Sequence, residues 1–475
     1  MIGILFHTMI TFSLGGVRLT FYKKSFIYFS MLLLLVLSTV AFADFEEDDY
    51  FFNLDSVKVV DISGSIANLI WDGFADEAIV TVVPEDGSDE SREVPIEFIN
   101  LVAQRLEIKN LKPETKYIVT FSIGEQSVNK EFKTKSMKIT RGPYLGMVTT
   151  NSVIVSWGAP DPIDGVTISV WPKEKPELKT SYIFEPQRIS LGDYDYKVTL
   201  ENLEPYKRYC YQVNLPHGTT KVYEFITAPK DKKQNFVFNV YGDTQWKNTH
   251  LQVARAMAEQ DDVSFLLHAG DVVDQPNPDR WQDFFSAGLE MIAQTPLYPI
   301  NGNHDLHNPE FRKYFALPGD DYWYSFDYGS IHVIALDVMS ALKKDSPQYQ
   351  WLIKDLEESK EMPWTVVFMH YPIYSGYAPL SNEPRNELQR DLVPVFEKYG
   401  VNIVFSGHEH QYDHYSYNEV HYIITGGGGS AALYPCPNEW NAPYHYMRVE
   451  VSPEKLVVKG IKTNGEIVEE FIITK

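Results

Sequence analysis

The sequence predicts a multidomain protein in which two all-β sandwiches precede an α/β domain built from two sheets. A tandem pattern of short alternating strands fills residues 50–229. From residue 235 onward, apolar β-branched runs alternate with helical stretches, and past residue 407 the pattern becomes rich in strands. The first pattern is typical of sandwiches and the second of α/β folds. A chain of 475 residues is long enough for two or three such domains.

The two predicted sandwiches share an internal repeat. Trp71 and Trp157 lie in equivalent strands, and each is followed by a Leu-x-Pro-x-x-x-Tyr segment that ends at Tyr117 or Tyr209. This arrangement resembles fibronectin type III domains, in which a corner tyrosine bonds to the loop before it. We expect one such domain over residues 50–137 and a second over 140–229, and we expect both tyrosines to be structural.

Residues 235–475 are predicted to form the α/β domain, after a polar, proline-containing linker at 228–233. The strand-rich pattern past residue 407 predicts a second sheet that packs on the first.

The amino terminus has the layout of a secretory signal. Lys23 and Lys24 precede an apolar run over residues 26–37, and Ala41 and Ala43 supply an A-x-A cleavage site. We therefore expect a signal peptide over residues 1–43, cleavage after Ala43, and a secreted or periplasmic protein with no stable membrane span. An uncleaved anchor helix is the alternative, although the run is short for a span. The absence of an Asn-x-Ser/Thr sequon after residue 43 favours a bacterial source.

The balance of charges limits the possible partners. There are 64 Asp and Glu residues against 42 Lys and Arg residues, and the formal net charge is −22. Such a protein repels polyanions, which argues against long nucleic acid, but a small phosphorylated substrate at a local cation site remains compatible. The only cysteines, Cys210 and Cys436, do not make a disulfide framework or a metal-ligand spacing.

Five polar segments between residues 242 and 410 carry the predicted chemistry. Four follow apolar, β-branched runs and the fifth follows PLYPI, so their side chains should converge on the carboxyl edge of a buried sheet. In order they are Gly242-Asp243-Thr244-Gln245, Gly270-Asp271-Val272-Val273-Asp274, Gly302-Asn303-His304-Asp305, Met369-His370 and Gly407-His408-Glu409-His410. Carboxylates, an amide oxygen and three imidazoles suit two adjacent divalent cations, such as iron, zinc or manganese.

The order of these motifs resembles the calcineurin-like metallophosphoesterase superfamily. The surrounding stretches YSFDYGSIHVIALD and MHYPIYS are most similar to its purple acid phosphatase branch, and the resemblance spans roughly residues 140–475. It implies a two-sheet domain with flanking helices and a dinuclear metal centre.

The resemblance also implies a role for each ligand. Asp243 and His410 would hold the first metal, His370, His408 and Asn303 the second, and Asp271 would bridge both because a carboxylate has two oxygens to share. Gln245 departs from the many relatives that have histidine there. Its oxygen coordinates a metal, or its amide makes a hydrogen bond near the centre; both alternatives stay open.

His304 resembles the family's catalytic histidine, and Asp274 is expected to orient it and to raise its pKa. Asn303 and His304 are the expected substrate contacts, and His307 is a further candidate for substrate contact. In purple relatives, a tyrosine stands at the position of Asp274 and binds Fe(III). The sequence therefore predicts a non-purple variant with two divalent ions.

The predicted function is a secreted, dinuclear metal-dependent phosphatase that hydrolyses phosphate monoesters by attack of a metal-bridging hydroxide. A phosphodiesterase or nucleotidase on the same metal core is the alternative enzyme. Residues 375–384 contain no histidine and Arg385 is the nearby cation, so the substrate class stays open. From a different class, the alternative is a surface-binding protein with a degenerate enzyme domain. The oligomeric state is not predicted.

Overall fold

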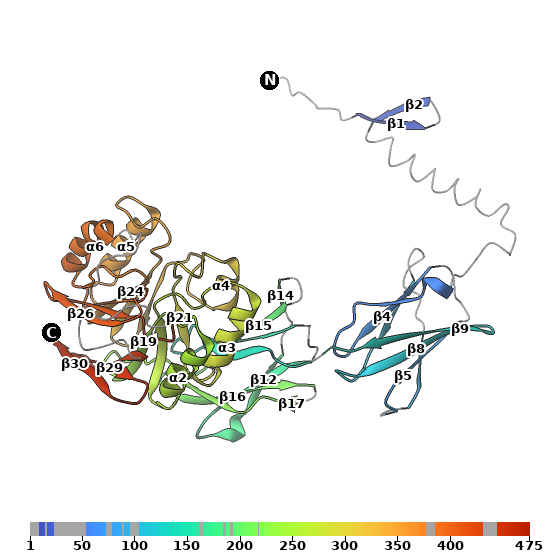
Figure 1. Cartoon of the computed structure of the whole chain (residues 1–475), viewed down its shortest axis with the longest axis horizontal. Helices are drawn as coiled ribbons and strands as arrows, with labels where there is room; N and C mark the ends of the chain where they lie inside the picture. The colour runs from blue at the N-terminus through green and yellow to red at the C-terminus, as the bar shows by residue number, and fades with distance from the viewer. Residues whose placement is uncertain are drawn as a thin grey trace. The chain divides into compact units, whose positions relative to one another are not determined.

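The computed structural model describes residues 9–14, 17–22, 54–72, 78–87, 90–95, 104–135, 137–160, 163, 165–183, 187–190, 193–216, 218–376, 385–430 and 444–475. It divides into two compact units, Met1–Ile62 with Ile66–Thr134, and Ser63–Ser65 with Lys135–Lys475 (Figure 1). Within the predicted leader, strands β1 (Met9–Leu14) and β2 (Val17–Tyr22) form an antiparallel hairpin. The apolar run at 26–37 and Ala43 lie outside the described residues.

The first unit contains an antiparallel sandwich. Its three-stranded sheet has the order β3-β4-β7, and its four-stranded sheet has the order β6-β5-β8-β9. The strands are β3 (Lys58–Val60), β4 (Ala67–Trp71), β5 (Ile79–Pro84), β6 (Arg92–Val94), β7 (Gln104–Ile108), β8 (Lys116–Ile123) and β9 (Gln126–Lys133). Alternate residues of β5 and β8 point inward, and Trp71 packs on Phe121 with ring centroids 5.1 Å apart.

The second sandwich has the same plan and belongs to the second unit. One sheet has the order β10-β11-β15-β14; the other has β13-β12-β16-β17, with β18 also pairing with β16. The strands are β10 (Arg141–Gly146), β11 (Val153–Ala159), β12 (Thr167–Pro172), β13 (Thr180–Ile183), β14 (Gln187–Ser190), β15 (Asp193–Leu200), β16 (Arg208–Leu215), β17 (Gly218–Thr219) and β18 (Tyr223–Ile226).

The corner tyrosines have the predicted structural role in both sandwiches. The Tyr117 hydroxyl accepts a hydrogen bond from Lys112 N at 2.8 Å, and the Tyr209 hydroxyl accepts one from Glu204 N at 2.9 Å. Each tyrosine fixes the loop that precedes its strand, as in a fibronectin type III corner. This prediction is confirmed.

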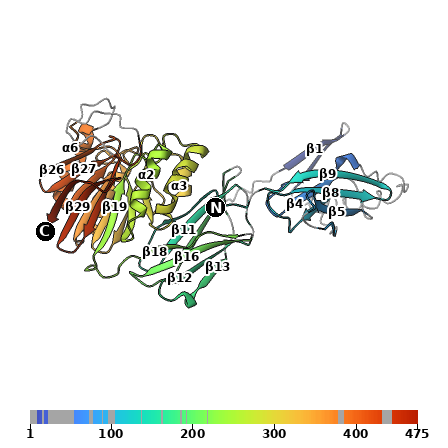
Figure 2. The same ribbon diagram turned by 60° about the horizontal axis from the view of Figure 1, so that its bottom comes forward.

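The α/β domain contains two six-stranded sheets, visible side by side in Figure 2. Sheet 1 has the order β21-β20-β19-β28-β29-β30, and sheet 2 has the order β22-β23-β24-β25-β27-β26. The strands are β19 (Phe236–Tyr241), β20 (Val263–His268), β21 (Leu297–Pro299), β22 (Tyr324–Tyr328), β23 (Ile331–Leu336), β24 (Trp364–Met369), β25 (Ile403–Ser406), β26 (Tyr412–Tyr417), β27 (Val420–Thr425), β28 (His445–Val451), β29 (Lys455–Lys462) and β30 (Ile467–Thr474). Strands β19–β21 are mutually parallel, as are β23, β24, β25 and β27.

Alternation along the central strands explains why the two sheets stack. In β24, Val366 and Phe368 belong to the large core shared with sheet 1, whereas Val367 and Met369 pack with the helices on the other side. All six residues of β24 are buried. A strand that is buried on both faces reads as a continuous apolar run, as the sequence does here.

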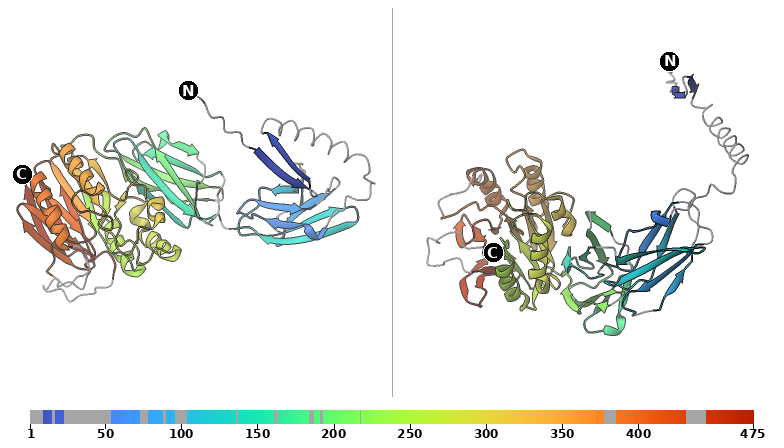
Figure 3. Two further views of the ribbon diagram at one scale, coloured as in Figure 1. Left: turned by 90° about the horizontal axis from the view of Figure 1, so that it is seen from above. Right: turned by 45° about the vertical axis from the view of Figure 1, so that its right-hand side comes forward.

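Helices cover the outer faces of both sheets. Helices α5 (Pro347–Glu358) and α6 (Arg385–Tyr399) contribute apolar side chains to the outer core of sheet 2, and Figure 3 shows α6 in orange beside this sheet. Helices α2 (Lys247–Ala258) and α3 (Pro278–Ile292) pack with sheet 1, and α4 (Pro309–Tyr314) follows β21. The predicted fold class of two sandwiches and an α/β domain of two sheets is therefore confirmed. The exact domain boundaries stay a prediction.

Two further features of the described residues bear on the expectations from the sequence. Cys210 is a buried free cysteine, and Cys436 lies outside the described residues. In the part of the chain that the structure describes, no helix combines the length and the apolar character needed to cross a membrane.

An ion pair network around the buried His332 of sheet 2 has a pH-dependent strength. His332 Nδ1 lies 2.7 Å from Asp327 Oδ1, and its Nε2 lies 2.8 Å from Asp355 Oδ2. Burial lowers the pKa of His332, but the two carboxylates together outweigh this effect and raise it to about 9. A histidine in the unfolded chain has a pKa of about 6.5. The network therefore stabilises the fold fully below that value, and its contribution is lost as the pH rises through about 9.

We predict that His332→Gln lowers the free energy of unfolding by about 2 kcal/mol near pH 6, because the neutral amide cannot replace the imidazolium. The loss should shrink toward zero near pH 10. Urea denaturation of the variant and the native sequence at both pH values measures the difference. An equal loss at both values would mean that packing, not charge, supplies the contribution of His332.

Candidate metal centre

The predicted polar residues lie at the carboxyl ends of strands from both sheets. Asp243, Asp271 and Asn303 follow β19, β20 and β21 of sheet 1, whereas His370 follows β24 and His408 and His410 follow β25 of sheet 2. Three of these residues have positive φ angles: 61° at Asp243, 54° at Asp271 and 69° at His408. L-residues with a side chain rarely adopt this conformation, and such strain concentrates at functional sites.

One group of possible ligands consists of Asp243, Asp271 and His410. Each offers one ligand atom, all of these atoms lie within 4.8 Å of one another, and all three residues are buried. His410 Nε2 is 3.5 Å from Asp243 Oδ1. Main-chain geometry also fixes Asp243, because both of its carboxylate oxygens accept from His408 N, at 3.0 and 2.9 Å.

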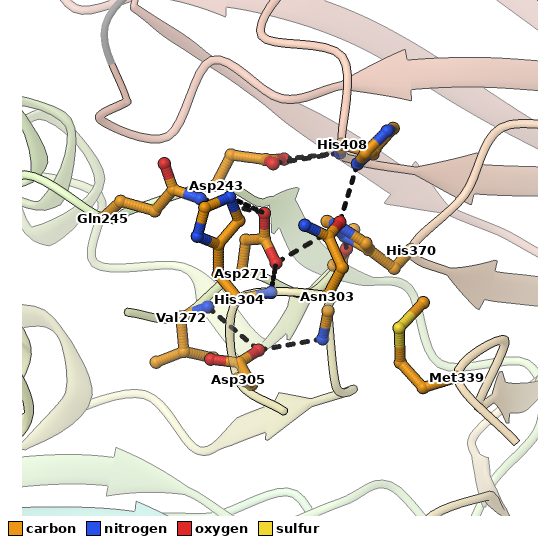
Figure 4. A network of polar contacts seen from close by, with 12 residues as sticks. Asp243, Gln245, Asp271, Val272, Asn303, His304, Asp305, Met339, His370 and His408 are labelled. Atoms are coloured by element: carbon orange, nitrogen blue, oxygen red, sulfur yellow. Dashed lines mark hydrogen bonds and ion pairs between the residues drawn. The ribbon is translucent and has the colours of Figure 1, made fainter. Parts of the chain in front are cut away.

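A second group consists of Asp271, His370 and His408, whose ligand atoms also lie within 4.8 Å of one another. Asn303 belongs with them, because its Oδ1 is 2.9 Å from His370 Nε2 and 2.8 Å from His408 Nδ1 (Figure 4). Asp271 is common to both groups. Buried carboxylate, imidazole and amide donors in this number fit two divalent cations, and Asp271 is placed to serve both.

The orientation of His370 suits a ligand. Its Nδ1 is hydrogen-bonded to Ala269 O at 2.8 Å, which leaves Nε2 facing Asn303 and Asp271. A carbonyl partner of this kind fixes the ring orientation of metal-binding histidines.

Opposite charges couple Asp271 and His370. Burial raises the pKa of Asp271, but His370 and then His304 outweigh this effect and hold it at about 2. Burial lowers the pKa of His370, whereas the charge of Asp271 and its hydrogen bond raise it to about 9. Asp271 is therefore ionised, as a metal ligand must be, and a bound cation would take the place of the imidazolium proton.

Gln245 makes the contacts of the hydrogen-bonding alternative. Its Nε2 donates to Asp271 Oδ2 at 2.9 Å, and its Oε1 accepts from Ser430 Oγ at 2.8 Å. The amide thus links the shared carboxylate to the loop after β27.

The expected support of His304 by the Asp274 carboxylate requires a correction. His304 Nδ1 is hydrogen-bonded to the main-chain oxygen of Asp274 at 2.8 Å, while Asp274 Oδ1 pairs with Arg280 Nε at 3.0 Å. Arg280 lies in the first turn of α3 and competes for the carboxylate. His304 is also held by its own main chain, because its N–H donates to Asp271 Oδ1 at 2.9 Å.

Asp305 has a role that the sequence did not reveal. Its fully buried carboxylate accepts from Gly302 N at 2.9 Å and from Val272 N and Val273 N at 3.2 Å each. Burial, followed by the charge of Asp271, raises its pKa to about 7. Asp305 therefore ties the loop of Asp271 to the loop of Asn303. Its position beside His304 in the Gly-Asn-His-Asp motif is the signal that could have found it.

Glu409 is a second residue that sequence reasoning missed. Its carboxylate accepts from Arg385 Nη2 at 2.8 Å, from Ser375 Oγ at 2.6 Å and from Gln411 Nε2 at 2.7 Å. The acid between His408 and His410 was the available signal. Because Arg385 pairs with Glu409, it is less suited to the substrate contact that its position suggested.

His307, the further candidate for substrate contact, is paired with a buried acid. His307 Nε2 is 2.7 Å from Asp337 Oδ2, and the side chain of Asp337 is fully buried. The hydrogen bond to Asp337 raises the pKa of His307. Its ring stacks on Tyr322 at a centroid distance of 4.7 Å. His307 is therefore the imidazole of this loop that is hydrogen-bonded to a carboxylate, whereas His304 Nε2 lies 4.0 Å from Asp271 Oδ2.

The glycine loop at 426–429 packs directly on the first ligand group. Gly428 N donates to Gly242 O at 2.8 Å, and a Cβ on Gly428 would lie 2.2 Å from the same oxygen. A Cβ on Gly426 would lie 3.0 Å from Asp243 Oδ2. These glycines therefore permit a close approach of the backbone to Asp243.

Three tyrosines, Tyr241, Tyr371 and Tyr412, stand beside the ligand motifs. Tyr412 donates to Glu469, and the fully buried ring of Tyr241 lies against His268 with centroids 4.6 Å apart. The ring of Tyr371 lies against that of His408, with centroids 4.7 Å apart. The expectation of a non-purple centre stays a prediction.

Comparisons with known proteins agree with the geometry. Residues 236–412 match the family model described as calcineurin-like phosphoesterase. The chain is 29% identical over 326 residues to a purple acid phosphatase of Glycine max, and the alignment covers 62% of this chain and 68% of that protein. It is 27% identical over 312 residues to acid phosphatase type 7 of Mus musculus, with 54% and 71% covered.

Among solved structures, a purple acid phosphatase from yellow lupin (Lupinus luteus) seeds has a TM-score of 0.60 at 16% identity, covering 87% of this chain and 93% of that one. This likeness is one of fold. The predicted resemblance is confirmed: the chain carries a calcineurin-like phosphoesterase domain and has purple acid phosphatase homologues. Such a domain indicates a hydrolase.

We predict that Asp271→Asn reduces bound metal to less than half of the native content, because a neutral amide cannot share two oxygens between cations. Elemental analysis of the purified variant measures the metal, and circular dichroism checks that the fold is retained. Asp327→Asn, which changes an exposed aspartate on β22, is the control and should keep the native metal content. A folded Asp271→Asn protein with full metal content would exclude a shared carboxylate.

Proposed function

We propose that this homologue of purple acid phosphatases is a dinuclear metal-dependent phosphatase that hydrolyses phosphate monoesters. The observation that carries the proposal is the position of Asp271, a buried carboxylate shared by two groups of ligand atoms. Asp243 and His410 would complete one metal site, and His370, His408 and Asn303 the other. When bound, two such cations supply a hydroxide nucleophile near neutral pH and neutralise charge on the phosphoryl oxygens.

The remaining steps fall to side chains of this chain. Asn303 is positioned by His370 and His408, and its amide would donate to a phosphoryl oxygen. The side chain of His304 is 45% exposed and lies beside Asp271, since its Nε2 is 4.0 Å from Asp271 Oδ2. We assign to this imidazole the transfer of a proton to the leaving oxygen.

His304 and His307 lie in the same loop. The imidazole of His304 is exposed, and that of His307 pairs with Asp337. His307 is three residues beyond His304 and is one-third exposed. Its Nε2 faces Asp337, so Nδ1 remains for a contact with the ester. We propose His307 as a second substrate contact, beside His304.

Two alternative functions differ from the proposed one in what would be observed. A phosphodiesterase would use the same metal ligands, and the substrate preference separates it from a monoesterase. A binding protein with a degenerate enzyme domain would be expected to lack part of the ligand set. Here the expected carboxylates, imidazoles and Asn303 all lie together. Export from the cytoplasm remains part of the proposal and rests on residues 1–43; the amino-terminal sequence of the purified protein tests it.

We predict that the full chain, loaded with zinc, manganese or iron, hydrolyses 4-nitrophenyl phosphate at least tenfold faster than bis(4-nitrophenyl) phosphate. Two cations suit a dianionic monoester better than a monoanionic diester. Initial rates with each metal give the comparison, and the chain treated with a chelator is the control. A preference for the diester would support the alternative enzyme, and no turnover of either ester would contradict a hydrolase at this centre.

We predict that His304→Ala reduces turnover of glycerol 2-phosphate about tenfold more than turnover of 4-nitrophenyl phosphate, because the aryl oxygen leaves without a proton. His307→Ala should raise KM for both esters similarly, since it removes a contact and not the acid. Metal content should remain native in both variants. Equal losses on both esters in His304→Ala would assign this residue to phosphate binding alone.

A further inference from the structure

An open groove lies beside the metal centre, at the amino-terminal ends of α2 and α3. Its volume is about 560 Å³, and Trp246, Lys247, Asn248, Thr249, Arg280, Asp283 and Tyr444 line it. This volume falls within the range of small-molecule sites.

Two chain connections place the groove next to the reacting groups. Trp246 directly follows Gln245, whose amide bonds to the shared Asp271 carboxylate at 2.9 Å. Arg280 pairs with Asp274, whose main-chain oxygen is hydrogen-bonded to His304. His304 is the proposed proton donor to the leaving group. The groove is therefore where the organic part of an ester bound at the metal centre would extend.

The aromatic lining favours a planar ring. Trp246 is 52% exposed, although its size and apolar character would ordinarily favour burial. Tyr444 lines the same groove and is half-buried. An exposed indole face stacks well on a nucleobase, and such stacking is tolerant of base identity.

The polar lining suits the edge of a heteroaromatic base. Asn248 is exposed and, within the described part of the chain, its side chain has no hydrogen-bond partner. It presents both a donor and an acceptor. Glycerol has hydroxyl groups for this amide but no planar face to stack on the indole.

The charges in the groove argue against a second phosphate. Lys247 Nζ lies 2.9 Å from Asp283 Oδ1, and Arg280 Nη1 lies 3.4 Å from Asp283 Oδ2. Arg280 Nε also pairs with Asp274 Oδ1 at 3.0 Å. Each lining cation thus pairs with a carboxylate, either Asp283 in the lining or Asp274 outside it, and this pairing weakens the attraction for a second phosphate.

We propose that this groove binds the nucleoside part of a nucleoside monophosphate, so that the protein acts as a phosphatase on nucleotides with a single phosphate. This inference rests on the proposed phosphatase function and adds the class of its leaving group. The base stacks on Trp246, the amide of Asn248 meets the edge of the base, and the phosphate lies at the metal centre.

The test compares kcat/KM for adenosine 5′-monophosphate, adenosine 5′-diphosphate and glycerol 2-phosphate with the metal-loaded full chain. We expect the monophosphate to exceed glycerol 2-phosphate at least tenfold and to exceed the diphosphate. Trp246→Ala should reduce the ratio of monophosphate to glycerol 2-phosphate about tenfold, in line with the loss of one stacked base, and Trp246→Phe should largely retain it. Tyr417→Ala removes a comparably exposed aromatic ring on β26 and is the matched control.

The nucleotide inference is overturned if Trp246→Ala leaves the ratio unchanged, or if glycerol 2-phosphate or the diphosphate is the better substrate. Equilibrium dialysis with adenosine separates this failure from a failure of the proposed function, because adenosine carries no phosphate. A chain that hydrolyses no ester but binds adenosine through Trp246 would contradict the phosphatase and retain the groove. A chain that hydrolyses esters without binding adenosine would retain the phosphatase and overturn the groove.

Discussion

The face-to-face packing of the two sheets is the constraint on which the rest of the site depends. Neither sheet supplies a complete donor set: sheet 1 contributes carboxylates and an amide, and sheet 2 contributes the imidazoles. Val366 and Phe368 of β24 join the core shared with sheet 1 and so hold the ends of β24 and β20 near each other. Asp271 lies where these ends meet, within 3.3 Å of His370 from the other sheet. Loss of the shared core would therefore separate the donors before it changed any of them.

The sequence allowed prediction of what depends on the order and type of residues. Buried parallel strands have continuous apolar runs, and a polar residue at the end of such a run lies at the sheet edge. For this reason Asp243 and His370 could be placed at the sheet edge from the sequence alone. Partners that depend on where a helix packs could not be predicted in the same way. Asp274 meets Arg280 because α3 starts beside its loop, and Glu409 meets Arg385 because α6 starts near β25. Both partners depend on the three-dimensional packing of the helices.

One loop after β21 brings together several roles. Asn303 faces the histidines of sheet 2, the N–H of His304 holds Asp271, and Asp305 fixes the loop from below through three main-chain amides. Leu306 and His307 follow with φ angles of 55° and 48°. Two consecutive positive φ angles in residues with side chains reverse the chain sharply, and they turn the imidazole of His307 toward Asp337. The loop is thus held by hydrogen bonds at both ends, which is the rigidity that a positioned ligand and a positioned acid require.

The buried acids around the centre divide by the kind of partner that they have. Glu409 is neutralised by an arginine, and Asp337 by an imidazole. Asp305 gives its oxygens to three amides and, because burial and Asp271 oppose its charge, its pKa is raised to about 7. Asp243 and Asp271 differ from these, because the imidazoles that face them, His410 and His370, are themselves expected metal ligands. Main-chain N–H groups and the amide of Gln245 also orient the two carboxylates, and among the described residues neither pairs with a lysine or arginine. A buried carboxylate in this state is costly unless a cation satisfies it. The two acids that the sequence motifs mark as metal ligands are thus the two whose basic partners are themselves expected metal ligands.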